Sequence, residues 1–184
     1  MDLSLVERVE GPNLILRLIR PEDAGYVQNL RTDPTYNRYL SEVRGTVEDQ
    51  RRWIEGYKAR ETEGREVYYV IERKDGTRCG LLRLYDIGDE SFTWGSWILD
   101  ANKPRKAALE SAMLSFGVGF NLLNLPDAFV DVRIDNEKAL AFYIRLGMKE
   151  LRRDKQDVYF VYPREAFEKD QNEFLKIVEQ EAQV

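Results

Sequence analysis

The stretch from Ser91 to Met148 constrains the fold of this chain more than any other part of the sequence. It begins with an aromatic, strand-like segment at 92–99, and a basic connection containing Pro104 leads into an apolar helix over 107–120. A second strand at 128–133 and a second helix over 135–148 follow. This order is that of a βαβα unit, whose first turn points helix N-terminal amides at any anion bound there. The pattern fits an anion site and an ordinary structural turn about equally.

The segments around this unit alternate between strand-like and helix-like character. Three strands precede it and two follow it, at 13–19, 66–72, 77–86, 149–153 and 157–162. Helices are predicted over about 21–31 and 46–64, and the second begins with Thr46 followed three positions later by Asp49, close to a capping box. Residues 164–183 predict an amphipathic C-terminal helix that packs on the domain or on a second subunit.

This order of elements predicts the fold class. Antiparallel strands followed by a parallel crossover indicate an α/β (α+β) fold with a mixed, mostly antiparallel sheet and helices on both faces. A chain of 184 residues is of ordinary size for one domain, so we expect a single domain over 1–184.

Composition excludes several classes of function. The net charge of -5 disfavours a nucleic-acid partner, and no apolar run approaches the roughly 20 residues that span a bilayer. The N-terminus lacks the pattern of a signal peptide, and the single cysteine, Cys79, fits a reducing compartment, so a cytoplasmic protein without a membrane partner is expected. The chain has no histidine, which removes triad catalysis and the usual zinc ligands, and no metal is expected.

The order of elements, together with the string Asn136-x-x-Ala139-x-x-Phe142-Tyr143-x-x-x-Gly147, resembles the GNAT superfamily of N-acetyltransferases. Three early strings, at 16–23, 30–34 and 52–54, resemble its RimJ/RimL-like branch. Within that branch, the strings at 83–86 and 94–97 look similar to bacterial enzymes that acetylate amino sugars on nucleotide carriers.

The resemblance implies acetyl-CoA as co-substrate and a splayed pair of parallel strands that holds its pantetheine. The cofactor would lie on the strand edge, on the turn and helix start that follow, and on the second helix. The positions that match are Trp97, Ile98, Leu99, Lys103, Arg105, Lys106, Ala107, Ala108, Asn136, Ala139 and Phe142. Asn136 is equally suited to cap the helix that follows it.

The pyrophosphate turn departs from the family pattern of Arg/Gln-x-x-Gly-x-Gly/Ala. The best register is Lys103-x-x-Lys106-x-Ala108, which places a lysine at the first glycine. Glycine adopts positive φ and lets a backbone approach a phosphate, and lysine resists both. Three cations beside the expected phosphates compensate, and a turn that no longer binds CoA is the alternative.

Acetyl transfer needs an oxyanion donor, a proton donor for the thiolate and a base for the amine. A backbone amide at a bulge near Ser96-Trp97 is expected to bind the oxyanion. By its position in the motif Tyr143 would protonate the thiolate, or else only pack beside Phe142. Glu90 is the chosen general base among the turn acids Asp86, Asp89 and Glu90, although three acids near a hairpin turn are more often solvated turn residues. Thr93 stands where relatives sometimes carry a glutamate, so water is the alternative base.

The acceptor is expected to be a small-molecule amine held by arginines and tyrosines. The residues concerned are Arg31, Tyr36, Arg38, Tyr39, Arg83 and Tyr85, although ordinary packing and solvation would explain them as well. A nucleotide-linked amino sugar of surface polysaccharide synthesis is the first choice. A protein N-terminus is the second, a non-catalytic binding module with this fold is the rival, and a homodimer is left open.

Overall fold

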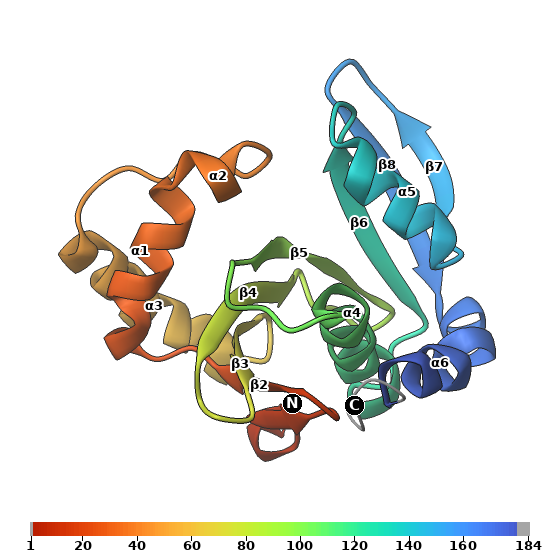
Figure 1. Cartoon of the computed structure of the whole chain (residues 1–184), viewed down its shortest axis with the longest axis horizontal. Coiled ribbons are helices and arrows are strands. Elements are labelled where there is room, and N and C mark those ends of the chain that lie inside the picture. The colour runs from red at the N-terminus through yellow and green to blue at the C-terminus, as the bar shows by residue number, and fades with distance from the viewer. Residues whose placement is uncertain (1, 180–184) are drawn as a thin grey trace.

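The computed structural model describes residues 2–179. The strands in this part of the chain form one eight-stranded sheet (Figure 1). Its strands are β1 (Arg8–Glu10), β2 (Leu14–Leu18), β3 (Val67–Arg73), β4 (Arg78–Tyr85), β5 (Ser91–Leu99), β6 (Asp127–Arg133), β7 (Lys149–Arg153) and β8 (Asp157–Pro163). Their order across the sheet is β1-β2-β3-β4-β5-β6-β8-β7. All neighbours are antiparallel except β5 and β6, which are parallel. The mixed, mostly antiparallel sheet that the sequence predicts is confirmed.

Helices cover both faces of this sheet. They are α1 (Ala24–Thr32), α2 (Pro34–Asn37), α3 (Val47–Thr62), α4 (Ala107–Gly117), α5 (Glu137–Arg145) and α6 (Arg164–Glu179), with short 3-10 turns η1 (Leu3–Leu5) and η2 (Pro21–Asp23) and a π-helical turn η3 (Val118–Leu122). Thr46 and Asp49 form the capping box expected at the start of α3. None of the helices among the described residues combines the length and the apolar character needed to cross a membrane.

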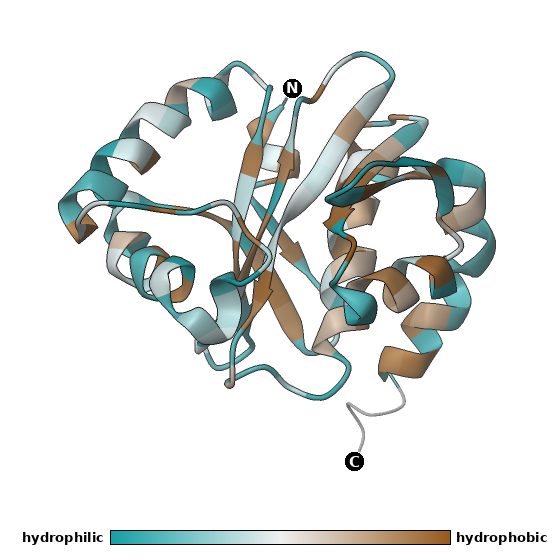
Figure 2. Ribbon diagram, turned by 90° about the horizontal axis from the view of Figure 1, so that it is seen from above, coloured by the Kyte–Doolittle hydropathy of each residue, from teal (hydrophilic) through white to brown (hydrophobic). Residues whose placement is uncertain are grey.

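Two separate apolar clusters hold the helices to the sheet. One cluster lies between the sheet and α4, α5 and α6, and includes Phe92, Trp94 and Phe116. The other lies between the sheet and α1 and α3, and includes Val27, Ile54 and Tyr57. The hydropathy view shows hydrophobic stretches on the central strands and on parts of the helices that flank them, interspersed with hydrophilic stretches (Figure 2). The sheet is therefore a rigid support with packed side chains on both faces.

The structure differs from the sequence-based elements near the N-terminus and at the ends of two helices. Strand β1 and turn η1 were not predicted, and the helix expected over 107–120 changes to π-helical geometry at Val118. Helix α6 contacts α4 and β8 of its own chain, which agrees with packing on the domain. The expected end of that helix, at 180–183, lies outside the described residues.

A buried carboxylate on α4 anchors the N-terminal strands. Glu110 is fully buried and accepts hydrogen bonds from the Asn13 backbone (2.7 Å), the Asn13 side chain (3.0 Å) and the Leu14 backbone (2.8 Å). A Cβ on Gly11 would lie 2.5 Å from the Glu110 Oε1 atom, so glycine is required at this close approach. This contact links the start of β2 to α4.

Replacing Glu110 with alanine is expected to lower the free energy of unfolding by about 2 kcal/mol, because a buried and a partly buried backbone donor lose their acceptor. Glu110→Gln keeps one carbonyl oxygen for those donors and should cost less than half as much. Urea unfolding of the three proteins measures both effects. Equal stability of Glu110→Ala and the wild type would show that the anchor contributes nothing.

Candidate active site

The parallel strands β5 and β6 separate shortly after they begin. They pair only at Ser91–Asp127, Phe92–Ala128 and Thr93–Phe129, whereas β5 continues to Leu99 paired with β4 alone. A cleft of about 260 Å³ lies where they diverge, and residues from both strands and from α5 line it. The last residues of β5, Trp97, Ile98 and Leu99, form one wall, so the strand edge predicted for a cofactor does face a cleft.

A β-bulge interrupts β5 beside this cleft. The pairing with β4 shifts between Leu81 and Arg83, and Ser96 has a φ of 51°. A bulge redirects the backbone and side chains of one strand relative to its neighbour. Ser96 and Trp97 both line the cleft, so the expected bulge lies where an oxyanion donor is needed. On the preceding Gly95, a Cβ would lie 3.2 Å from the Tyr85 hydroxyl, which shows how closely that phenol approaches the bulge.

Tyr143 extends from α5 to the cleft. Its side chain is 6% exposed and its ring is edge-on to Trp94 (6.0 Å between centroids) and near Phe160 (6.1 Å). Burial raises the pKa of Tyr143, and the charges of Asp131 and Tyr85 raise it further. The phenol is therefore neutral throughout the physiological range and keeps a proton to donate.

Asp131 is an acid of the cleft that the sequence analysis missed. It lies on β6 and lines the same cleft as Tyr143. Its residue is exposed by accessible area, but partial burial of the carboxyl group raises its pKa, and the negative charge of Asp157 adds to the effect. A carboxylate with a raised pKa accepts a proton more readily than a solvated one, which is typical of general bases. The available signal was an acid placed between the apolar residues Val130 and Val132 of β6.

The acids chosen from the sequence lie elsewhere. Asp86, Asp89 and Glu90 are exposed in the turn before β5, and none of them lines the cleft. Glu90 precedes Gly95 by five residues, which is roughly 17 Å along an extended strand. Among residues 2–179, no cluster of three or more acidic or cysteine side chains could hold a metal ion.

The connection from β5 to α4 has the geometry of an anion-binding turn. Lys106 has a φ of 60° and a ψ of 7°, the left-handed conformation for which glycine is usual. No side chain caps the amides of the first turn of α4, which begins with Ala107 and Ala108. Lys103, Arg105 and Lys106 are exposed on this connection. Tyr26 stabilises its beginning by donating a hydrogen bond to Asp100 Oδ2 (2.7 Å).

The left-handed lysine leads to a stability prediction. A non-glycine residue in this conformation lowers the free energy of unfolding by about 1–2 kcal/mol, whereas glycine has no Cβ and avoids this penalty. Lys106→Gly and Lys106→Ala both remove the cation, but only glycine relieves the backbone. We expect Lys106→Gly to be about 1 kcal/mol more stable to urea than Lys106→Ala. Equal stability of the two variants would contradict a left-handed Lys106 in solution.

The remaining cofactor candidates surround the cleft or support it. Asn136 and Ala139 line it, and Asn136 also caps α5 by accepting a hydrogen bond from the Ala139 backbone (3.3 Å). Trp97 donates a hydrogen bond to Ser111 Oγ (3.2 Å), and its ring lies 5.4 Å from that of Phe142. Asn136 thus has the capping role that the sequence left open, in addition to its place at the cleft.

The segment around α2 crosses the open side of the cleft. Tyr36 accepts a hydrogen bond from the Ala101 backbone (3.2 Å), after β5. Tyr39 donates one to the Asp135 carbonyl (3.2 Å), after β6, and Arg38 lies 3.8 Å from the Asp135 carboxylate. Tyr36 and Tyr39 therefore line the cleft, and Arg38 is at its exposed rim; their predicted role in acceptor binding stays a prediction.

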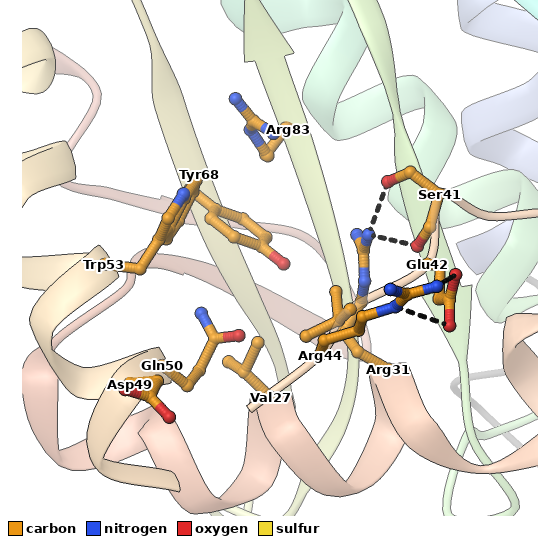
Figure 3. A pocket seen from close by; sticks show the side chains of 11 residues that line it. Val27, Arg31, Ser41, Glu42, Arg44, Asp49, Gln50, Trp53, Tyr68 and Arg83 are labelled. Carbon is orange, nitrogen blue, oxygen red and sulfur yellow. Dashed lines mark hydrogen bonds and ion pairs between the residues drawn. The ribbon is translucent and has the colours of Figure 1, made fainter. Parts of the chain in front are cut away.

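Two other predicted acceptor residues, Arg31 and Arg83, lie at a different cavity. This cavity, here called the α1–α3 pocket, has a volume of about 470 Å³ and is lined by Arg31, Ser41, Gln50, Trp53, Tyr68 and Arg83, among others (Figure 3). Tyr85 lies between the two cavities: its hydroxyl is over Gly95, and the Arg83 guanidinium is 5.0 Å from its ring. Burial, followed by the charge of Asp131, raises the pKa of Tyr85 to about 12.

Comparisons with known proteins agree with this geometry. A family model described as an acetyltransferase (GNAT) domain matches residues 13–149. Among solved structures, the chain is similar to apo FdhC, described as a nucleotide-linked sugar GNAT, with 32% identity, coverage of 91% of this chain and 96% of that chain, and a TM-score of 0.84.

Two further solved structures show the same fold at lower identity. Spermidine N-acetyltransferase from Vibrio cholerae, in complex with CoA and spermine, is 20% identical over 84% of this chain and 97% of that chain, with a TM-score of 0.70. A GNAT-family acetyltransferase from Bacillus anthracis is 16% identical over 86% and 99%, with a TM-score of 0.72. A search of curated proteins found no match.

Proposed function

Since this chain belongs to the GNAT family of acetyltransferases, we propose that it transfers an acetyl group from acetyl-CoA to the primary amine of a nucleotide-linked amino sugar. Membership makes the chain an acyl-CoA-dependent N-acetyltransferase. The acetyl donor, its position and the acceptor are the parts that we propose. Both proposed substrates are cytoplasmic metabolites, so we place the reaction in the cytoplasm.

Acetyl-CoA fits the cleft between β5 and β6. The edge of β5 from Trp97 to Leu99 has no strand partner on the β6 side and is available to the amide groups of pantetheine. The pyrophosphate would lie on the uncapped first turn of α4, where the left-handed Lys106 reproduces the backbone conformation of a glycine. The lysine at this position therefore does not remove the anion-binding geometry, and its charge favours a phosphate.

Asp131 and Tyr143 carry out different proton transfers of the proposed reaction. Asp131 takes a proton from the bound ammonium, and the neutral amine attacks the thioester carbonyl. A backbone amide at the Ser96–Trp97 bulge stabilises the oxyanion that forms. As the carbon–sulfur bond breaks, Tyr143 gives its proton to the thiolate and regains one from the nitrogen. The overall products are the amide, CoA and one proton, which leaves through Asp131.

The choice of acceptor rests on the similarity to FdhC. FdhC is described as a nucleotide-linked sugar GNAT, and its 32% identity extends over 91% of this chain. The pocket beside the cleft agrees with such an acceptor, because Arg31 and Arg83 supply cations and Trp53 supplies a ring. The two arginines suit phosphates and repel a cationic polyamine, and the ring is suited to stack a base.

Release of free CoA tests the proposal directly. The protein receives acetyl-CoA with UDP- and dTDP-linked amino sugars, with spermidine, or with a peptide bearing a free N-terminus. We expect turnover with at least one nucleotide-linked amino sugar at a kcat/KM at least 100-fold above that for spermidine or the peptide. Preference for the peptide would support the protein N-terminal alternative instead, and no turnover with any amine would support a non-catalytic module.

A further inference from the structure

The α1–α3 pocket contains a buried cation without a counter-ion. Arg31 is 7% exposed and donates hydrogen bonds from one terminal nitrogen to the carbonyl and hydroxyl oxygens of Ser41 (3.0 and 2.8 Å). No carboxylate among residues 2–179 lies within ion-pair distance of it, and its Nε atom is buried without a hydrogen-bond partner in this part of the chain. The carboxylates of Glu42 and Asp49 also line the pocket, but Glu42 pairs with Arg44 and Asp49 pairs with Arg52. The buried charge of Arg31 has no such ion pair among the described residues, and an uncompensated buried charge is costly, so the Arg31 side of the pocket favours an anionic ligand.

A second guanidinium faces the same pocket from the sheet. Arg83 of β4 pairs with Glu66 (2.7 Å), which satisfies one of its terminal nitrogens. Its Nε atom is also buried without a partner among the described residues. Figure 3 shows Arg31 and Ser41 on one side of the pocket and Trp53 and Tyr68 on the other, with Arg83 above. Two guanidinium groups near one space are suited to the several oxygens of a diphosphate.

An aromatic platform borders these cations. Trp53 of α3 is 40% exposed, and its ring is stacked on Tyr57 at 5.8 Å and edge-on to Tyr68 at 6.0 Å. The Arg83 and Arg60 guanidinium groups lie 5.4 and 5.5 Å from the centroid of the Trp53 ring. The ring is therefore held in place by its neighbours, and its residue lines the pocket. A rigid, partly exposed indole beside guanidinium groups is suited to stack a planar heterocycle.

The pocket adjoins the cleft through the sheet. Tyr68 on β3 pairs with Arg83 on β4, and Arg83 pairs with Gly95 on β5, so the three residues form one row across neighbouring strands. Neighbouring strands are about 4.8 Å apart, so Arg83 is one strand from the bulge. The loop over both cavities is also continuous, since Leu40 lines the cleft and Ser41 lines the pocket. One extended ligand can therefore occupy both.

We propose that the α1–α3 pocket binds a nucleoside diphosphate, with the diphosphate against Arg31 and Arg83 and the base on Trp53. In the context of the proposed function, on which this orientation of the acceptor rests, the sugar amine then points past Tyr85 towards Asp131. The pocket binds the nucleotide and sets acceptor specificity, whereas the chemistry takes place in the cleft.

Calorimetric titration of the whole protein tests the pocket without turnover. UDP, dTDP, ADP and GDP, uridine and inorganic pyrophosphate are titrated separately in the presence of saturating CoA, which occupies the α4 end. We expect at least one nucleoside diphosphate to bind at least 10-fold more tightly than either pyrophosphate or uridine, because only it meets both the cations and the ring. No binding of any nucleoside diphosphate, or equal binding of pyrophosphate, would overturn the proposal.

Variants locate the binding site. Trp53→Ala removes the partly exposed ring and should weaken nucleoside diphosphate binding about 10-fold. Arg31→Lys keeps the charge but loses the fork of donors and should weaken it to a similar degree. The control is Arg65→Ala, an exposed arginine paired with Glu63 outside the pocket, which should bind as the wild type does. Nucleotide binding insensitive to Trp53→Ala would place it elsewhere, for example at α4, and overturn the proposal.

Kinetics separate this inference from the proposed function. If an amino-sugar nucleotide is acetylated, Trp53→Ala should raise its KM about 10-fold while kcat changes less than threefold. Turnover with an unchanged KM would leave the proposed function standing and refute the pocket assignment. Nucleotide binding that depends on Trp53 without turnover of any amino-sugar nucleotide would leave the pocket standing and refute the proposed acceptor.

Discussion

Replacing Tyr143 with phenylalanine is expected to lower kcat about 100-fold. The phenol is the acid of the cleft in this mechanism, and general acid catalysis contributes typically about 10²–10⁴-fold. Phenylalanine keeps the ring contacts with Trp94 and Phe160, so the fold should persist. Initial rates of CoA release at saturating substrates measure the loss, and urea unfolding checks the fold.

The control for Tyr143→Phe is Tyr162→Phe. Tyr162 is a fully buried tyrosine of the same apolar cluster, does not line the cleft, and has a hydroxyl without a hydrogen-bond partner among the described residues. Its loss should leave kcat within twofold of the wild type. Unchanged kcat in Tyr143→Phe would remove Tyr143 from the mechanism and leave it a packing residue.

Replacing Asp131 with asparagine is expected to lower kcat/KM about 100-fold and to abolish the acid limb of its pH profile. The pKa of Asp131 is raised by burial and then by Asp157, so the carboxylate becomes protonated at a higher pH than a solvated aspartate does. The active, deprotonated form is present above the raised pKa and is lost as the pH falls through it. As the pH is lowered, the wild type should therefore lose its activity with a midpoint higher than pH 3.8, the ordinary pKa of aspartate, and it should keep its activity at pH values above that midpoint.

Two further variants test this assignment. Asp157→Asn removes the neighbouring charge and should move the acid limb to lower pH while activity is retained. Glu90→Gln decides between Asp131 and the acid predicted from the sequence. A large loss in Glu90→Gln with little loss in Asp131→Asn would contradict the structural assignment and uphold the earlier one.

Much of the fold follows from local patterns. The capping box at Thr46, the hairpin between β3 and β4, and the strand–helix order of 91–148 each depend on neighbouring residues, so sequence periodicity predicts them. The bulge near Ser96 was expected from the resemblance to a family, because nothing in the string Trp94–Gly95–Ser96–Trp97 alone requires a register shift.

The functional details that were missed depend on contacts between distant segments. Asp131 becomes a candidate base only because β6 diverges from β5 and because Asp157 lies near it. Lys106 looked unsuited to its turn, yet it adopts the left-handed conformation, since the flanking strand and helix determine the backbone there. The α1–α3 pocket combines Arg31, Trp53 and Arg83 from three elements, and Trp53 drew no functional prediction from the sequence.

The central claim is that acetyl-CoA lies between β5 and β6 with its pyrophosphate on α4. Hydrogen–deuterium exchange of the protein with and without acetyl-CoA tests it most directly, because backbone amides that gain a partner exchange more slowly. The account predicts slower exchange at residues 97–99 and 106–109, and no comparable change in α3. Unchanged exchange in both segments at saturating acetyl-CoA, or protection confined to other parts of the chain, would contradict it.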